Sequence, residues 1–174
     1  MNVAHAAARV AIADASEAYC QRLRARFGLA PDAGSAPDPS ALRGLAYCGR
    51  EFRAYPAMRI SDAMRFYASL HARWSDVRVR ELLALAGLEE RFEIGRMKRA
   101  YQRALVLCFA LASEPDVLVV ENAEEFDEER SHALLQRALE LVPRTIVTYG
   151  VNVTHPLDGM PDARDAEHLA PEAV

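Results

Sequence analysis

The sequence predicts an α/β fold. Three apolar runs of strand length, at 42–48, 116–121 and 144–149, are separated by stretches in which apolar residues recur at helical spacing. In the clearest stretch, a helix over 97–112 leads through Ser113-Glu114-Pro115-Asp116 into the strand Val117–Val120. That strand ends on acidic residues. Strands that alternate with helices in this way are typical of α/β proteins.

The N-terminal segment is predicted to be one long helix. Residues 3–27 contain neither Gly nor Pro. Their apolar side chains recur at helical spacing, namely Ala8, Ile12, Ala15, Tyr19, Leu23 and Phe27. Gly28 is expected to end this helix. Residues 31–40 are rich in Pro, Asp, Ser and Ala, so residues 1–40 are expected to form a helix followed by a linker.

The remaining elements follow from the same periodicity. Ser61 is expected to cap a helix over 62–72, whose apolar stripe is Met64, Phe66, Tyr67 and Leu70. Further helices are predicted at about 76–86 and 127–141. Beyond Pro156 the chain turns polar, and residues 156–174 are expected to form a flexible tail.

Composition narrows the class of protein. The chain has 174 residues, which favours one domain with extensions. Its net charge of −4 and pI near 5.8 argue against general binding to nucleic acid or to anionic membranes. Three cysteines without CxxC spacing are interpreted as reduced, mostly buried thiols. No apolar run reaches the length of a membrane span and no signal peptide is visible, so we expect a cytoplasmic protein without direct membrane insertion.

Five linked segments between residues 43 and 150 carry a family resemblance. They are 46–50, 55–60, 66–76, 81–88 and 110–115, and their spacing holds without gaps from Tyr47 to Asn122. Together they resemble the nucleotide-binding subunit of ABC transporters, especially those serving ABC-2-type exporters. The resemblance implies a truncated P-loop-NTPase-like core over residues 41–155, with a small parallel sheet and a helical subdomain over about 57–112.

The resemblance also implies an incomplete sheet. The strand that precedes the phosphate-binding loop in this family has no counterpart here, so Thr145–Tyr149 is expected to form an unpaired edge. A bare edge invites pairing with another chain. We therefore expect the helix at 3–27, or a partner, to take the place of part of the missing structure beside this edge.

The positions at which this family binds and hydrolyses ATP are changed. A phosphate loop of the form GxxxxGK[ST] is absent, because Lys98 is the single lysine and Met97 precedes it. By resemblance, the signature serine is Lys98, the signature glycine is Ala100, and the strand-end Asp-Glu pair is Glu121-Asn122. With the Q-loop, D-loop and switch positions added, the degenerate nucleotide-site positions are Arg50, Lys98, Ala100, Glu121, Asn122, Asp127 and Val151.

These changes predict a protein without ATPase activity. Micromolar affinity corresponds to about 8 kcal/mol, and charge-assisted hydrogen bonds of about 1.5–3 kcal/mol each supply most of that in a phosphate cradle. Without the cradle we expect at most weak nucleotide binding. We assign no catalytic residue and no cofactor. The five histidines show no metal-ligand spacing, so we assign no metal site.

Several charged residues have two interpretations. Glu121 is interpreted as a solvated strand-end carboxylate rather than a Mg²⁺ ligand, since no phosphate loop completes such a site. A solvated helix face is favoured over an anion site for Lys98, Arg99 and Arg103. The acidic run over 124–129 is interpreted as complementing the dipole of the following helix rather than as a cation site.

A partner-binding surface is predicted on the helical subdomain, which in the related subunits faces a permease. Its candidate residues are Phe52, Tyr55, Met58, Phe66, Tyr67 and Trp74. At helical spacing these residues also suit a core, so both interpretations stay open.

Three functions follow. The first is a pseudo-ATPase subunit that docks to a membrane permease or an active ATPase, or pairs with itself, at the inner face of the membrane. The second is a soluble scaffold in another bacterial assembly. The third is an enzyme that borrows a phosphate loop from another chain.

Overall fold

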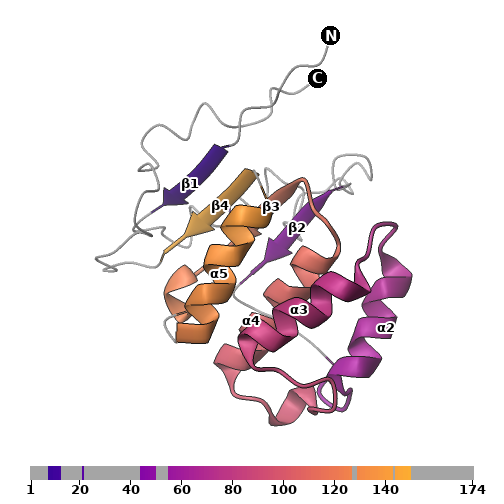
Figure 1. Ribbon diagram of the computed structural model, residues 1–174. Coiled ribbons are helices and arrows are strands. Elements are labelled where there is room, and N and C mark those ends of the chain that lie inside the picture. The colour runs from indigo at the N-terminus through magenta and orange to yellow at the C-terminus, as the bar shows by residue number, and fades with distance from the viewer. Residues whose placement is uncertain are drawn as a thin grey trace.

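The computed structural model of the chain is a parallel β-sheet with helices packed against it (Figure 1). It describes residues 8–12, 21, 44–49, 55–126, 129–142 and 144–149. The strands are β1 (Ala8–Ile12), β2 (Leu45–Cys48), β3 (Val117–Val120) and β4 (Arg144–Thr148). The α-helices are α2 (Ile60–Leu70), α3 (Asp76–Ala86), α4 (Arg99–Ala112) and α5 (Glu129–Leu141). Two short 3-10 helices are η1 (Ile94–Arg96) and η2 (Ala123–Glu125).

The sheet has the strand order β1-β4-β3-β2, and all three pairings are parallel. The helices α2, α3 and α4 form the connection from β2 to β3, and α5 connects β3 to β4. Helix α4 packs against β2, α3 and α5. Parallel strands need such helical crossovers, which cover the sheet. The predicted small parallel sheet with a helical subdomain is therefore confirmed.

The prediction of an unpaired edge at Thr145–Tyr149 is wrong. Strand β4 lies inside the sheet, with β3 on one side and β1 on the other (Figure 1). The register with β1 runs from Ala8 opposite Arg144 to Ile12 opposite Thr148. The N-terminal segment itself therefore supplies the strand that covers this edge.

The predicted helix over 3–27 is wrong at residues 8–12, which form a strand. The alanines of this stretch favour a helix, because Ala has the highest intrinsic helix propensity, but tertiary context overrides such a preference. Val10 and Ile12 are β-branched and suit a strand. The hydrogen-bonding groups of β4 needed a partner, and that demand outweighed local helix propensity. Gln21 is helical, and the rest of the segment, the linker at 31–40 and the tail at 156–174 lie outside the described residues.

The N-termini of α3 and α2 are stabilised in different ways. Ser75 caps α3 as its side-chain oxygen accepts from the backbone N–H of Arg78 at 3.2 Å. Ser61 was expected to cap α2, which is wrong, since α2 begins at Ile60 and has no side-chain cap. The backbone N–H groups of Ile60 and Ser61 instead donate to carbonyl oxygens of the 90–92 loop, at 3.0 and 2.9 Å. Tertiary contacts thus replaced the cap.

The core lies between the sheet and α3, α4 and α5. In β3, Leu118, Val119 and Val120 are completely buried. Cys48 and Cys108 are buried free thiols, as predicted, and burial raises the pKa of Cys48 to about 11. Both thiols are therefore protonated at neutral pH. None of the described helices has the length and apolar character needed to cross a membrane.

Candidate functional site

The carboxyl ends of β2, β3 and β4 meet at one edge of the sheet, because the strands are parallel. Gly49 follows β2, Glu121 follows β3 and Tyr149 follows β4. The backbone N–H of Glu121 donates to the Cys48 carbonyl at 3.0 Å, which keeps the first two ends together. This edge is where ligands bind in open α/β sheets.

An arginine from α4 fills the space between the first two strand ends. The guanidinium of Arg103 donates to the backbone carbonyl oxygens of both Gly49 and Glu121. Its Nε lies 3.3 Å from a carboxylate oxygen of Glu125, close enough for a charge contact, although Nε makes no hydrogen bond. The guanidinium also lies 5.3 Å from the centre of the Phe126 ring. A fixed internal cation therefore joins β2, β3 and η2.

This placement corrects the interpretation of Arg103 as part of a solvated helix face. Arg103 is only 2% exposed, whereas Lys98 and Arg99 are exposed. A signal for this was present in the sequence. From Ala104 to Ala112 the helix is apolar on every side, which is typical of a buried helix. A charged residue at the start of such a stretch needs buried acceptors.

Glu121 is completely buried, so its interpretation as a solvated strand-end carboxylate is wrong. Its neighbour Asn122 has φ 52° and ψ 56°, the left-handed region that Asn adopts more readily than Glu. The Asn122 side chain donates to Glu124 at 3.2 Å, and its backbone N–H lies 3.4 Å from the Thr148 hydroxyl. The amide residue at this position therefore suits the turn into η2.

The acidic run has a different partner from the one expected. Glu125 pairs with Arg103 and also lies 3.6 Å from the guanidinium of Arg99. The Glu125 carboxylate therefore interacts with arginines of α4 and not with the N-terminal dipole of α5. Glu129 does lie in the first turn of α5, as predicted.

The signature positions lie at the start of α4. Lys98 is exposed just before the helix, and Ala100 is half-buried in its first turn. Through Arg99 and Glu125 this turn is joined to η2, which follows β3. Arg50, Asp127 and Val151 lie outside the described residues. Within the described part of the chain, no three His, Cys, Asp or Glu side chains gather where they could hold a metal ion.

The predicted partner-binding residues form a connected aromatic cluster. Ring centres are 5.7 Å apart for Tyr55 and Phe66, and 5.6 Å apart for Phe66 and Tyr67. Tyr67 and Trp74 both lie against the buried ring of Phe109, at 5.0 and 5.9 Å. Of the remaining candidates, Met58 is half-buried against the core and Phe52 lies outside the described residues.

The two ends of this cluster differ in exposure. Tyr55 is 59% exposed, and Leu70, which is not among the predicted partner residues, is 62% exposed. Leu70 lies one helical turn after Phe66, so both share a face of α2. His71 lies between Tyr67 and Trp74, with ring centres 6.4 and 6.1 Å away. Partial burial raises the pKa of Tyr67 and lowers that of His71, which favours the uncharged form of each.

Solved structures of known proteins share this fold. A protein assigned as a cobalt transport ATP-binding protein matches with a TM-score of 0.64 and 18% identity, over 88% of this chain and 60% of that chain. An assigned ABC transporter ATP-binding protein from Pyrococcus furiosus matches with a TM-score of 0.67 and 13% identity, over 90% of this chain and 84% of that chain. The ATP-binding subunit of an ABC transporter matches with a TM-score of 0.65 and 15% identity, over 96% of this chain and 85% of that chain.

No family model matches the sequence, and no curated protein matches it. At identities of 13–18% the structural matches bear on the fold. The chain therefore has the fold of ABC transporter ATP-binding proteins, with a small parallel sheet and a helical subdomain.

Proposed function

We propose that the protein is a catalytically inactive, ABC ATPase-like subunit that acts by protein–protein interaction. It docks to a membrane permease or to an active ABC ATPase, and thereby assembles or regulates the complex. The single observation that carries this proposal is the buried guanidinium of Arg103 at the ends of β2 and β3.

The Arg103 guanidinium disfavours the binding of a Mg²⁺–nucleotide complex at this edge of the sheet. In P-loop ATPases the strand-end carboxylate holds Mg²⁺, which bridges the phosphates. Here Arg103 already binds the backbone at the strand end, and a Mg²⁺ ion beside it would be repelled by a fixed positive charge. Asn122 carries an amide where the resemblance calls for the carboxylate that polarises water. The 174 residues also contain no GK[ST] sequence.

The aromatic cluster on the helical subdomain, together with Leu70, supports the docking part of the proposal. A protein that docks to a permease through its helical subdomain should keep apolar side chains exposed there. Tyr55 and Leu70 are the more exposed members of such a surface, and the half-buried rings of Phe66, Tyr67 and Trp74 link it to the core. Aromatic residues are enriched in the cores of protein interfaces.

The alternative of a soluble scaffold has lost its two supporting features. It rested on a long N-terminal helix and on an unpaired edge at Thr145–Tyr149. Residues 8–12 form a strand, and this strand pairs with β4 along that edge.

The alternative of an enzyme with a phosphate loop borrowed from another chain would still require Arg103 to leave the strand ends. That movement breaks two buried hydrogen bonds.

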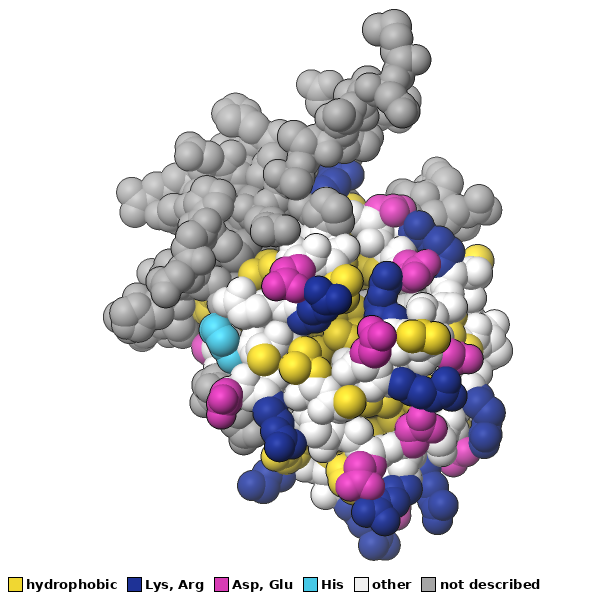
Figure 2. Space-filling model, viewed as in Figure 1, with side chains coloured by type: hydrophobic (Ala, Val, Ile, Leu, Met, Phe, Trp, Pro, Cys, Tyr) yellow, Lys and Arg dark blue, Asp and Glu magenta, His cyan; other side chains and the backbone are white. Residues whose placement is uncertain are grey.

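We place the protein at the cytoplasmic face of a membrane, held there by its partner. Figure 2 shows Lys, Arg, Asp and Glu side chains interspersed on one face, with hydrophobic side chains between them. That face offers no broad surface of one charge, which supports the expectation that nucleic acid is not a partner.

Docking is tested by Tyr55→Glu combined with Leu70→Glu. Both side chains are exposed, so folding should be unaffected, whereas a charge in an apolar interface disfavours binding. We expect affinity purification from the native host to capture a permease or an ABC ATPase subunit with the unmodified protein. The double variant should recover less than about a tenth as much, corresponding to a loss of about 1.4 kcal/mol or more.

The matched control is Leu85→Glu, which places the same charge at a 38% exposed apolar residue on α3. This variant should capture the partner as the unmodified protein does. Equal capture by the Tyr55→Glu/Leu70→Glu protein would remove this surface from the proposal. If neither a permease nor an ABC ATPase is captured by any of the three proteins, the proposed function is wrong.

A further inference from the structure

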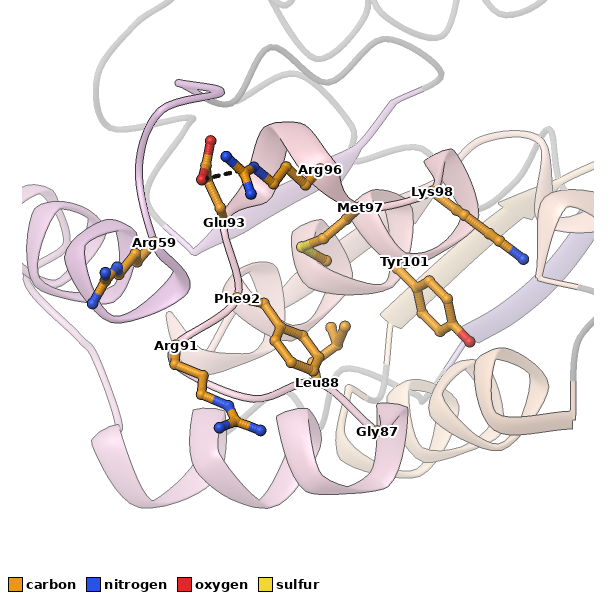
Figure 3. Close-up of a pocket in the computed structure, with 10 residues that line it drawn as sticks. All are labelled: Arg59, Gly87, Leu88, Arg91, Phe92, Glu93, Arg96, Met97, Lys98 and Tyr101. Carbon is orange, nitrogen blue, oxygen red and sulfur yellow. Dashed lines mark ion pairs between the residues drawn. The ribbon is translucent and has the colours of Figure 1, made fainter.

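A pocket lies on the helical subdomain, between the start of α2 and the start of α4. It has a volume of about 700 Å³, within the range of small-molecule sites. Figure 3 shows its lining: the side chains of Leu88, Phe92, Met97 and Tyr101 in the middle, with cationic side chains around them. Among the described residues, the lining cations are Arg59, Arg91, Arg96 and Lys98, and the lining carboxylate is Glu93.

The wall of this pocket is held by backbone contacts. The Ile94 N–H donates to the Met58 carbonyl at 3.0 Å, and the Gly95 N–H donates to the Pro56 carbonyl at 2.8 Å. A side chain on residue 95 would place its Cβ 2.8 Å from that same oxygen, so this close approach requires glycine. The Gln102 side chain adds hydrogen bonds to the carbonyls of Ile94 and Met97, at 3.1 and 3.0 Å. The pocket is therefore preformed, which lowers the entropic cost of binding.

The cations that line the pocket differ in whether a described carboxylate pairs with them. Arg96 pairs with Glu93 at 3.1 Å, and Arg91 pairs with Glu89 at 2.7 Å. Arg59 and Lys98 form no ion pair with any residue that the structure describes. In a chain whose net charge is −4, the pocket thus holds two cations that no described carboxylate pairs, beside apolar side chains.

We propose that this pocket binds a small amphiphilic anion, with an aromatic or aliphatic body and a single carboxylate, sulfonate or phosphate group. The apolar body covers Leu88, Phe92 and Met97, and the anionic group pairs with Lys98 or Arg59. A polyanion such as ATP fits poorly, because Arg91 and Arg96 are already neutralised and Glu93 repels additional negative charge.

The probe is 8-anilinonaphthalene-1-sulfonate, which joins an apolar ring system to one sulfonate. N-phenyl-1-naphthylamine has the same rings without the charge. We expect the sulfonate to bind with micromolar affinity, with amide chemical-shift changes centred on Phe92 and Met97, and the neutral analogue to bind at least tenfold more weakly. Lys98→Gln combined with Arg59→Gln should weaken sulfonate binding at least tenfold and leave the neutral analogue unchanged, because only the sulfonate forms charge-assisted hydrogen bonds with these side chains.

The matched control is Arg65→Gln combined with Arg137→Gln, which removes two exposed arginines outside the pocket lining. It should bind the sulfonate as the unmodified protein does, and all variants should share one urea unfolding midpoint. The proposal is overturned if the sulfonate does not bind, if Lys98→Gln/Arg59→Gln leaves its affinity unchanged, or if the neutral analogue binds equally well. Displacement of the dye by micromolar ATP would overturn the ligand class.

Discussion

Replacing Arg103 by Met is expected to lower the free energy of unfolding by about 2–5 kcal/mol. The substitution removes the donors for the carbonyls of Gly49 and Glu121, which are buried and have no access to water as a substitute. It also leaves Glu125, itself only partly exposed, without its buried partner. Urea unfolding at neutral pH, followed by circular dichroism, measures the change.

Arg137→Met is the matched control, since it removes an arginine paired with Glu140 at 2.7 Å on the exposed surface of α5. A surface ion pair of this kind contributes about 0–1 kcal/mol, so this variant should unfold close to the unmodified protein. A loss below about 1 kcal/mol for Arg103→Met would mean that the guanidinium does not hold the strand ends together.

Phe126→Ala is expected to cost about 3–5 kcal/mol. The ring is 1% exposed and belongs to the core, so its removal loses apolar burial and leaves a cavity. It also removes the aromatic face that lies 5.3 Å from the Arg103 guanidinium. Tyr55→Ala, at a ring that is 59% exposed, should cost about 1 kcal/mol or less.

The double variant Arg103→Met/Phe126→Ala tests the contact between the two side chains. For two residues in contact, the effects of single substitutions on the free energy of unfolding do not simply add, and the coupling energy is about 0.5–3 kcal/mol. We expect the double variant to lose less stability than the sum of the two single losses. Strict additivity in urea unfolding would indicate that the guanidinium and the ring act independently.

Much of the fold was predictable, because periodicity and local stop signals agreed with it. Helices α3 to α5 and strands β2 to β4 lie close to their predicted ranges, since each has a strong apolar pattern. Helix α3 also has a clear start at Ser75 and a clear end at Gly87. The N-terminal strand was not predictable in the same way. Its formation depends on β4, more than 130 residues later in the sequence, and no local window contains that information.

The site was predicted less completely than the fold. The family resemblance pointed to the strand-end residues Glu121 and Asn122, but their burial and backbone conformation follow from neighbours that only the folded chain brings together. The apolar stretch after Arg103 indicates its burial, but its acceptors are backbone carbonyls, which no residue pattern reveals. The cationic pocket was missed for a similar reason. Its lining comes from separate parts of the chain, around Arg59, Leu88 and Lys98.

Isothermal titration of the purified protein with Mg·ATP tests the central claim most directly. With Arg103 at the strand ends and no phosphate loop in these 174 residues, we predict no heat of binding up to millimolar nucleotide, which limits the binding free energy to about 4 kcal/mol. A micromolar dissociation constant for Mg·ATP, abolished by Glu121→Gln, would contradict the account.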